Sequence, residues 1–357
     1  MRKNIRHGSR ERQRSLLVSV VIGKNPLRWQ RKINCQASIG KVVELNTLES
    51  IDAKGTGSFK DLYMLLKPRV MWLAVFTAAV GIIIAPIQNN LFISLVVLLC
   101  ISIGAGAAGG LNMWWDKELD NMMERTNSRP LPNEKISSDD AFVFGLSLSI
   151  FSVMFLGLVS NWLAAFLLAL TIFFYLVIYS MFLKTTTPQN IVIGGAAGAM
   201  PPLIGWVAST GTISNEPLLL FLFIFLWTPP HFWSLAIITK DDYAKASIPM
   251  FPVLYGVEKT RRSILYYTII LIIFSQAISL SEIGGPVLFL SSNVLNAVLL
   301  LSAVRLVRLN ENTGYERERK FFKFTILYLF LYFSFLVINR GVETLEPVMS
   351  LAWPALF

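Results

Sequence analysis

Residues 91–130 read LFISLVVLLCISIGAGAAGGLNMWWDKELDNMMERTNSRP, an apolar run followed directly by a strongly charged segment. The apolar part, residues 91–111, has about the twenty residues that a helix needs to cross a bilayer. Polar side chains then recur at four-residue intervals, first Asn112, Asp116 and Asp120, and next Arg125 and Arg129. Side chains four residues apart lie on one face of a helix. The stretch therefore predicts a membrane helix that ends in a row of polar groups at the membrane surface.

The composition of the whole chain is that of a membrane protein. Hydrophobic residues make up 54% and charged residues 15% of the 357 residues, whereas a soluble chain would have about 25% charged residues. Nine apolar runs approach spanning length, at about 70–87, 91–111, 141–159, 162–182, 191–209, 217–238, 264–283, 286–304 and 321–338. They are rich in small residues and do not alternate as barrel strands do. We predict an all-α integral membrane protein, a bundle of nine transmembrane helices.

The distribution of charge predicts the topology. The net charge is +10, but it is not spread as a nucleic-acid-binding surface would require. Four short linkers carry almost no charge, at 88–90, 160–161, 210–216 and 281–285. Glu216 and Glu282 are the charged residues in them, while Lys and Arg gather in the opposite linkers. Since basic loops stay in the cytoplasm, we expect a cytoplasmic N-terminus and, with nine spans, a C-terminus outside.

The two ends of the chain differ from the bundle. Residues 1–60 form a basic tail, which we expect to be disordered or interfacial; residues 61–345 form the nine-helix domain; residues 346–357 form a short outside tail. The basic tail could instead be a mitochondrial transit peptide, or residues upstream of the natural start. A disordered or interfacial tail favours a bacterial inner membrane, and a transit peptide favours a mitochondrial inner membrane.

Three local patterns are predicted to serve packing. Gly104, Gly106 and Gly109 match the dinucleotide pattern GxGxxG, but they lie inside a membrane span, where small residues allow close helix packing. Cys100 lies within the same span, which indicates a small core residue. Pro201 and Pro202 lie within the run at 191–209 and are expected to kink or break it, either for packing or to line a cavity.

The polar row after residue 111 has the chemistry of a diphosphate site. Asn112, Asp116 and Asp120 supply oxygen atoms of the kind that Mg²⁺ prefers. Arg125 and Arg129 supply guanidinium groups that bind phosphate with two hydrogen bonds. The alternative is a solvated helix end with salt bridges between neighbours. In a chain this apolar, the expected ligand is a diphosphate that carries a lipid tail.

Two further sites have more than one interpretation. Asp241 and Asp242 follow the sixth run, on the same side of the membrane as the polar row, and form either a second metal-facing group or a solvated loop. His231 lies in WTPPHFWSL, within the sixth run. An ionisable group inside the membrane is a functional candidate, so His231 could contact haem, relay a proton, or be a hydrogen-bonded core residue.

Several blocks together resemble a known family. They are LLKPRVM (65–71), NMWWDKELDNMMERTNSRPLP (112–132), LKTTTPQNIVIGGAAGAMPPLIGW (183–206), WTPPHFWSLA (227–236) and DDYAKASIPMFPV (241–253). With the Asn-xxx-Asp-xxx-Asp pattern, they are similar to the intramembrane UbiA-type prenyltransferase superfamily, and within it to the haem O synthases (protohaem IX farnesyltransferases). The resemblance implies a central cavity that faces the cytoplasm. It covers most of residues 60–340 in order and leaves the N-terminal tail outside.

The resemblance implies an activity and a set of site residues. The activity is transfer of farnesyl from farnesyl diphosphate to a vinyl group of haem b, giving haem O, with Mg²⁺ as cofactor. The implied catalytic and Mg²⁺-binding residues are Asn112, Asp116, Asp120 and Asp242. The implied diphosphate-binding residues are Arg125, Arg129, Lys184, Lys67 and Arg69. The implied haem pocket consists of His231, Trp227 and Trp233. The implied partners are the lipid bilayer and a haem A synthase or terminal oxidase assembly.

Two departures from the superfamily pattern weaken parts of this assignment. Asp242 is followed four residues later by Ala246, so a second complete Asp-xxx-Asp pattern is missing, and the usual Lys-Arg pair is Lys184-Thr185. Three other functions stay open: prenylation of a quinone precursor or chlorin, a multi-pass transporter, and a haem-binding scaffold. A transporter would place its acids near the bilayer midplane, whereas these acids gather at one membrane face.

Overall fold

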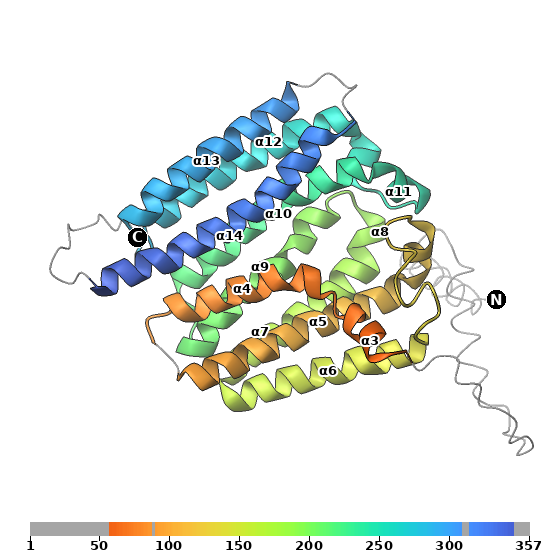
Figure 1. Ribbon diagram of the computed structural model, residues 1–357, viewed down its shortest axis with the longest axis horizontal. Coiled ribbons are helices and arrows are strands. Elements are labelled where there is room, and N and C mark those ends of the chain that lie inside the picture. The colour runs from red at the N-terminus through yellow and green to blue at the C-terminus, as the bar shows by residue number, and fades with distance from the viewer. Residues whose placement is uncertain (1–56, 88–89, 309–313, 346–357) are drawn as a thin grey trace, which may run out of the picture. The chain divides into compact units, whose positions relative to one another are not determined.

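The computed structural model describes residues 57–87, 90–308 and 314–345. Every regular element in these residues is helical (Figure 1). The elements are α3 (Phe59–Leu65), α4 (Pro68–Ile84), α5 (Leu91–Met122), α6 (Ser138–Val159), α7 (Trp162–Phe173), the π-helix η2 (Phe174–Leu183), α8 (Lys184–Thr186), α9 (Asn190–Thr210), α10 (Asn215–Ile238), α11 (Lys240–Lys245), α12 (Phe251–Ser279), α13 (Pro286–Val307) and α14 (Glu316–Leu345). The predicted all-α class is confirmed.

The long helices are membrane spans by length and composition. Within the described residues, eight are long and apolar enough to cross a bilayer: α5, α6, the continuous α7–η2–α8 segment, α9, α10, α12, α13 and α14. α3 and α4 pass the same test as a pair, although they are bent by 55° at the break between them. The protein is therefore a multi-pass helical membrane protein. Residues 1–56 of the predicted tail at 1–60, and the whole predicted tail at 346–357, lie outside the described residues. Phe59 and Lys60, the last residues of the predicted N-terminal tail, begin α3.

The break between α3 and α4 places Lys67 against α5. Lys67 has a left-handed backbone, with φ 51° and ψ 50°, directly before Pro68. Proline disfavours the helical conformation in the residue before it, which ends α3 and lets α4 start in a new direction. A Cβ added at Gly106 would lie 3.1 Å from Leu66, and one at Gly109 would lie 3.5 Å from Lys67. The predicted packing role of these glycines is confirmed.

α9 continues through its two prolines. Pro201 and Pro202 lie inside an uninterrupted helix, so the predicted break does not occur. α4 packs closely against this segment. A Cβ added at Gly81 of α4 would lie 2.2 Å from the carbonyl oxygen of Pro202, and a Cβ added at Gly205 of α9 would lie 2.2 Å from the carbonyl oxygen of Ala78. Backbone packing of this kind is what small residues allow in membrane helices, and it holds the proline segment in helical form.

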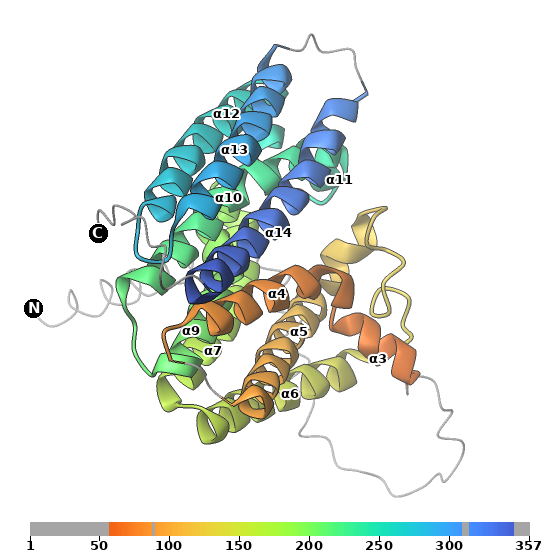
Figure 2. The ribbon, with the colours of Figure 1, turned by 60° about the vertical axis from the view of Figure 1, so that its left-hand side comes forward.

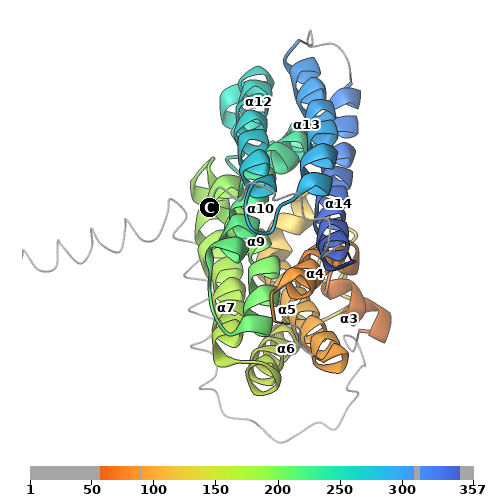
Figure 3. The same ribbon diagram turned by 90° about the vertical axis from the view of Figure 1, so that its left-hand side faces the viewer.

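α12, α13 and α14 are joined by buried polar contacts; α12 and α14 pack against α10, and α13 packs against α12 and α14 (Figures 2 and 3). Asn296 of α13 donates to the Ser275 hydroxyl at 3.1 Å and accepts from the Tyr328 hydroxyl at 2.8 Å. Arg261 of α12 forms a buried ion pair with Glu318 of α14 at 2.6 Å. Hydrogen bonds between membrane helices stabilise their association, so these contacts hold α12, α13 and α14 together.

Cys100 of α5 is 1% exposed, as predicted for a core residue.

Candidate active site at the C-terminal end of helix α5

The row of polar side chains at the end of α5 is buried. Asn112 is 5% exposed, and Asp116 and Asp120 are each 1% exposed, on a helix that continues to Met122. A carboxylate this buried is strongly unfavourable unless it is paired or hydrogen-bonded. The alternative of a solvated helix end therefore does not apply. We call Asn112, Asp116 and Asp120 the acidic ladder.

Three cations surround the acidic ladder. Lys184 Nζ lies 2.6 Å from Asp116 Oδ2, and Arg129 Nη1 lies 2.6 Å from Asp120 Oδ2. Lys67 Nζ donates to Asn112 Oδ1 at 2.6 Å, and the charges of Asp116, Asp120, Arg129 and Lys184 all act on Lys67. The cluster thus joins three cations to two carboxylates. Lys67 bonds to an amide oxygen and not to a carboxylate, so it is a candidate partner for a bound anion.

The π-helix brings further groups to this cluster. The Asn112 amide donates to Asp116 Oδ2 and to the Ser180 hydroxyl, each at 2.8 Å. Ser180 in turn donates to the carbonyl oxygen of Tyr175, five residues earlier, at 2.8 Å. π-Helical segments are rare and often occur at functional sites. Here the segment delivers Ser180, and Lys184 directly after it, to the acidic ladder.

Two tyrosines of the π-helix lie beside the cluster. Tyr175 and Tyr179 stack with ring centroids 5.6 Å apart and an interplanar angle of 11°. The charges of Asp116, Asp120 and Arg129 act on Tyr175. Gly194 of α9 leaves room for the second ring, because a Cβ there would lie 2.3 Å from Tyr179. Aromatic faces thus adjoin the polar cluster, an arrangement that favours a cationic organic group.

The oxygen atoms of the ladder suit a magnesium ion that is shared with a substrate. Asp116 Oδ1 is buried and has no hydrogen-bond partner in the described part of the chain. No cluster of three or more His, Cys, Asp or Glu side chains suited to a metal occurs within residues 57–87, 90–308 and 314–345. Mg²⁺ usually takes one or two protein carboxylates and completes its shell with phosphate and water. The donors fit Mg²⁺ bound with a phosphorylated ligand rather than Mg²⁺ held by protein alone.

The second acidic segment lies at the same end of the molecule. Lys245 Nζ of α11 pairs with Glu124 Oε1, just after α5, at 2.8 Å. Asp241 is exposed and Asp242 is half-buried, and neither belongs to the ion pairs of the acidic ladder. The structure therefore brings α11 close to the segment that follows the ladder, without joining Asp242 to the ladder's ion pairs.

The link between Glu124 and Lys245 gives a pH prediction. The hydrogen bond from Lys245 lowers the pKa of Glu124 below its usual 4.5, and the same bond raises the pKa of Lys245 above 10.5. The stabilising effect of Glu124 is thus complete above pH 4.5 and lost as the pH falls through the lowered value. We expect Glu124→Gln to speed hydrogen exchange in α11 at neutral pH, and this difference from the wild type to vanish in acid.

Protection factors in α11, measured across pH, test this expectation. Glu258→Gln is the matched control, because Glu258 pairs with Arg262 within α12 and is 69% exposed. A difference between wild type and Glu124→Gln that persisted well below pH 4.5 would mean that the side chain acts by packing and not by its charge.

The remaining diphosphate candidates are more exposed. Arg125 and Arg69 are both exposed, whereas Arg129 is half-buried against Asp120. The structure thus gathers Arg129, Lys184 and Lys67 around the ladder, and it gives Arg125 and Arg69 no ion pair among the described residues.

His231 is held rigidly between α10 and α14. Its ring stacks on Trp227 at 4.3 Å and on Phe322 at 4.6 Å. Its Nδ1 lies 2.8 Å from the Thr325 hydroxyl, and that hydroxyl donates to the carbonyl oxygen of Phe322 at 2.7 Å. Because the hydroxyl proton is used, Nδ1 must be the donor to Thr325. The ring therefore carries its proton on Nδ1 and presents a lone pair at Nε2.

This hydrogen-bond chain ends at a backbone carbonyl, which has no proton to pass on. With its proton on Nδ1, the ring keeps a lone pair on Nε2, the state in which histidine binds a metal. The stacking and the hydrogen bond also fit a core residue, so the haem contact of His231 stays a prediction.

The two tryptophans near His231 face different neighbours. Trp227 stacks on His231 and donates from Nε1 to the Thr325 carbonyl oxygen at 2.9 Å. Trp233 packs against Phe251 at 4.8 Å, in α12. Trp227 thus shares the environment of His231, whereas Trp233 belongs to the contact between α10 and α12.

Sequence patterns alone missed Tyr175, Tyr179, Ser180 and Thr325. The first three do leave a signal, because they place polar atoms four and five residues apart within the apolar run 162–182. Thr325 leaves none, since it is 94 residues from His231 and only the packing of α14 on α10 brings them together.

Comparison with known proteins places the chain among prenyltransferases. Residues 74–335 match the model of the UbiA prenyltransferase family. The protoheme IX farnesyltransferase of Dinoroseobacter shibae is 50% identical over 292 residues, which cover 81% of this chain and 93% of that protein. The protoheme IX farnesyltransferase of Paracoccus denitrificans is 46% identical over 299 residues, covering 83% of this chain and 98% of that protein.

Solved structures share the fold at lower identity. A digeranylgeranylglyceryl phosphate synthase has a TM-score of 0.66 at 20% identity, over 79% of this chain and 98% of that one. A UbiA homolog from Archaeoglobus fulgidus bound to GPP and Mg²⁺ has a TM-score of 0.55 at 17% identity, over 77% of this chain and 99% of that one. The family match covers most of the chain, so the chain belongs to the UbiA prenyltransferase family.

Proposed function

We propose that the protein transfers a farnesyl group from farnesyl diphosphate to a vinyl group of haem b, giving haem O. The names and high identity of the relatives support this substrate pair. The observation that carries the proposal is the buried cluster in which Lys67, Lys184 and Arg129 surround the acidic ladder. Such a cluster at the end of a membrane span suits a diphosphate whose apolar tail stays within the bilayer.

Binding of the diphosphate uses both signs of charge. The ladder and Asp242 would hold Mg²⁺, which supplies positive charge to the diphosphate oxygens. Lys67, Lys184 and Arg129, with Arg125 and Arg69 nearer the surface, would bind the same oxygens directly. Guanidinium and ammonium groups placed where negative charge develops lower the barrier to departure of a leaving group.

The bond changes follow from an allylic leaving group. The carbon–oxygen bond of farnesyl diphosphate breaks and its electron pair leaves with the diphosphate. The terminal vinyl carbon of haem b attacks the allylic cation, which moves the positive charge to the carbon next to the porphyrin. Water adds there and loses a proton, which leaves a hydroxyethylfarnesyl side chain. The stacked rings of Tyr175 and Tyr179 would stabilise the allylic cation.

His231 would bind the haem substrate through Nε2. Its fixed tautomer supports a bond from this nitrogen to the haem iron, and Trp227 would form part of the same pocket. Trp233 would support that pocket from the α12 side. The aromatic rings on both faces of His231 limit rotation of the imidazole, so the haem would be held in one orientation.

Thr325 is then a positioning residue for His231. We expect Thr325→Val to weaken binding of haem b by about 10–100-fold, the usual effect of losing the partner of a metal-binding histidine. Thr325→Ser should bind nearly as the wild type does, because it keeps the hydroxyl. The measurement is a haem titration followed by the absorbance of the haem. Equal affinity and equal spectra for the valine and serine variants would refute this role.

The membrane arrangement proposed from the sequence completes this function. Counting α3 and α4 as one broken span gives nine spans, with residues 61–345 as the catalytic domain and a central cavity open to the cytoplasm. The basic residues place the ladder and the N-terminus on the cytoplasmic side and the C-terminus outside. We favour the bacterial inner membrane over the mitochondrial inner membrane. A haem A synthase or terminal oxidase assembly would receive the product.

One experiment separates this function from its rivals. The protein in membranes is given haem b, farnesyl diphosphate and Mg²⁺, and the extracted haems are weighed by mass spectrometry. The expected result is a mass gain equal to a farnesyl group plus a hydroxyl group. Parallel reactions contain 4-hydroxybenzoate or a chlorophyllide in place of haem. Prenylation of either, with haem unchanged, would assign the enzyme to a quinone or chlorin pathway instead.

A further inference from the structure

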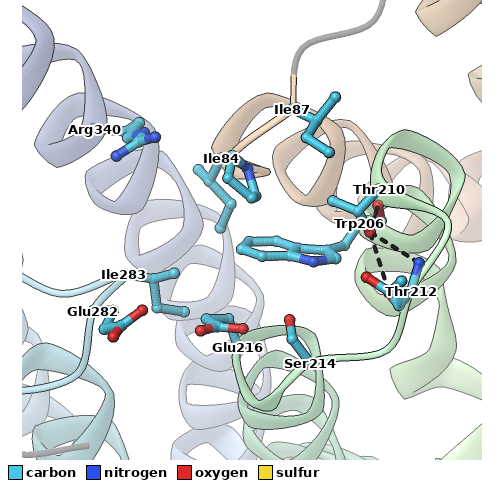
Figure 4. Close-up of a pocket in the computed structure, with 11 residues that line it drawn as sticks. Ile84, Ile87, Trp206, Thr210, Thr212, Ser214, Glu216, Glu282, Ile283 and Arg340 are labelled. Atoms are coloured by element: carbon cyan, nitrogen blue, oxygen red, sulfur yellow. Dashed lines mark hydrogen bonds between the residues drawn. The ribbon is translucent and has the colours of Figure 1, made fainter.

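A second polar pocket lies at the opposite end of the bundle from the acidic ladder. The length of α4 gives the separation between the pocket and the ladder. Lys67, which contacts the ladder, directly precedes α4, and Ile84, the last of the 17 residues of α4, lines the pocket. A helix of 17 residues is about 25 Å long. The pocket has a volume of about 320 Å³ and opens to the surface (Figure 4). We call it the far pocket.

The far pocket lies at a membrane–water boundary. It is lined from four places where spans end or begin: the end of α4, the α9–α10 turn, the α12–α13 turn and the last part of α14. Its floor is the indole of Trp206, which is 3% exposed. Ile84 and Ile283 add apolar contacts, and Ile87 at its edge is 55% exposed. A ligand here would thus meet an apolar floor below a polar rim.

The charges of the short linkers converge on this pocket. Glu216 and Glu282 are the charged residues of the linkers at 210–216 and 281–285, and both line it. Figure 4 shows Glu282 and Glu216 along the lower edge of the view, Ser214 next to Glu216, Thr212 at the right and Arg340 of α14 at the upper left. The pocket therefore combines two carboxylates with one guanidinium and the hydroxyl groups of Thr212 and Ser214.

This chemistry selects the kind of ligand. Two carboxylates that line one pocket attract a cation that donates hydrogen bonds. A bare metal ion would need more oxygen ligands, and the described residues supply no group of three acids. A dianion such as haem would be repelled by Glu216 and Glu282. The hydroxyls of Thr212 and Ser214 suit a phosphate joined to that cation.

We propose that the far pocket binds the headgroup of a phospholipid that carries a primary ammonium, of the phosphatidylethanolamine type. The ammonium lies toward Glu216 and Glu282, and the phosphate lies toward the hydroxyls of Ser214 and Thr212. The glycerol and the first part of the acyl chains contact Ile84 and Ile87. A lipid is favoured over a free amine because the pocket combines the headgroup chemistry with an apolar edge at the membrane boundary.

A methylation series tests the ammonium without altering the protein. Phosphatidylethanolamine, its N-monomethyl and N,N-dimethyl derivatives and phosphatidylcholine keep the charge but lose hydrogen-bond donors one at a time. Retention of each lipid by the purified protein is measured by native mass spectrometry, in mixtures with matched acyl chains. We expect retention to fall along the series by about tenfold overall, the effect of losing about 1.4 kcal/mol in charge-assisted hydrogen bonding. Equal retention of all four lipids would overturn the proposal.

Variants locate the effect in the far pocket. Glu216→Gln/Glu282→Gln should lose the preference for phosphatidylethanolamine, while the matched change Glu258→Gln, in an exposed pair on α12, should keep it. If the double variant does not fold, each single variant should show part of the loss. An unchanged preference in these variants would place the lipid elsewhere.

A last arm separates the lipid from its free headgroup. Soluble phosphoethanolamine is added at increasing concentration to protein loaded with the lipid. We expect it to displace the lipid only weakly, since it lacks the apolar contacts. Displacement at equal concentrations would contradict the lipid assignment. Farnesyl transfer is assayed in the same samples, so a failure here is distinguishable from a failure of the proposed function.

Discussion

Replacing Asp116 by asparagine is expected to lower farnesyl transfer by about 10²–10³-fold, the range for loss of one electrostatic group at a reacting centre. Asp116 holds Lys184 and Asn112 through Oδ2, and its buried Oδ1 has no hydrogen-bond partner in the described part of the chain. The measurement is single-turnover transfer in nanodiscs with saturating substrates. The matched control is Asp139→Asn, an exposed acid in the first turn of α6, which should be nearly as active as wild type.

Folding must be separated from catalysis in this variant. Removing one partner of a buried ion pair typically destabilises a protein by about 3–5 kcal/mol, and Asp116→Asn leaves Lys184 unpaired. The double variant Asp116→Asn/Lys184→Met removes both charges and should recover stability while staying inactive. A double variant that is stable and transfers farnesyl at the wild-type rate would show that neither group takes part in catalysis.

Lys184→Met alone should act mainly on the diphosphate. Lys184 is 10% exposed in its side chain and lies 2.6 Å from Asp116, so its charge is only weakly screened. We expect kcat/KM for farnesyl diphosphate to fall by about 10²-fold, and inhibition by inorganic pyrophosphate to weaken in parallel, because both carry the same charged group. Haem b binding should be unaffected, since His231 lies in α10 and bonds to α14.

Lys245→Met is the matched control for Lys184→Met. Lys245 is at the same end of the molecule but is exposed and pairs with Glu124, outside the acidic ladder. We expect pyrophosphate inhibition to be close to that of the wild type. If the two variants lost pyrophosphate inhibition equally, the effect would come from the general positive charge of this end and not from the ladder.

The sequence predicted the ladder because a helix has a fixed period. Four-residue spacing after an apolar run is enough to place Asn112, Asp116 and Asp120 on one face, and the structure has them there and buried. Their partners could not be predicted in the same way. Lys67 reaches Asn112 because its own backbone, directly before Pro68, is left-handed. The π-helix turns Ser180 toward Asn112. Both are results of tertiary packing.

The prolines show the opposite case. Local chemistry predicts a kink or a break at Pro201 and Pro202, yet α9 continues without a break through both prolines, where α4 packs on it closely at Gly81 and Gly205. Asp242 shows the same limit at the site. Its position beyond a span predicts the correct end of the molecule, but the turn of α11 decides that Lys245 is the residue that contacts the segment after α5.

The central claim is that the acidic ladder and a diphosphate bind one divalent ion together. Mn²⁺ in place of Mg²⁺, with inorganic pyrophosphate, allows a direct measurement of ³¹P coupling to the bound ion by electron–nuclear double resonance. We predict clear coupling in the wild type and in Asp139→Asn, and its loss in Asp116→Asn/Asp120→Asn. The same coupling in that double variant as in the wild type would contradict the account.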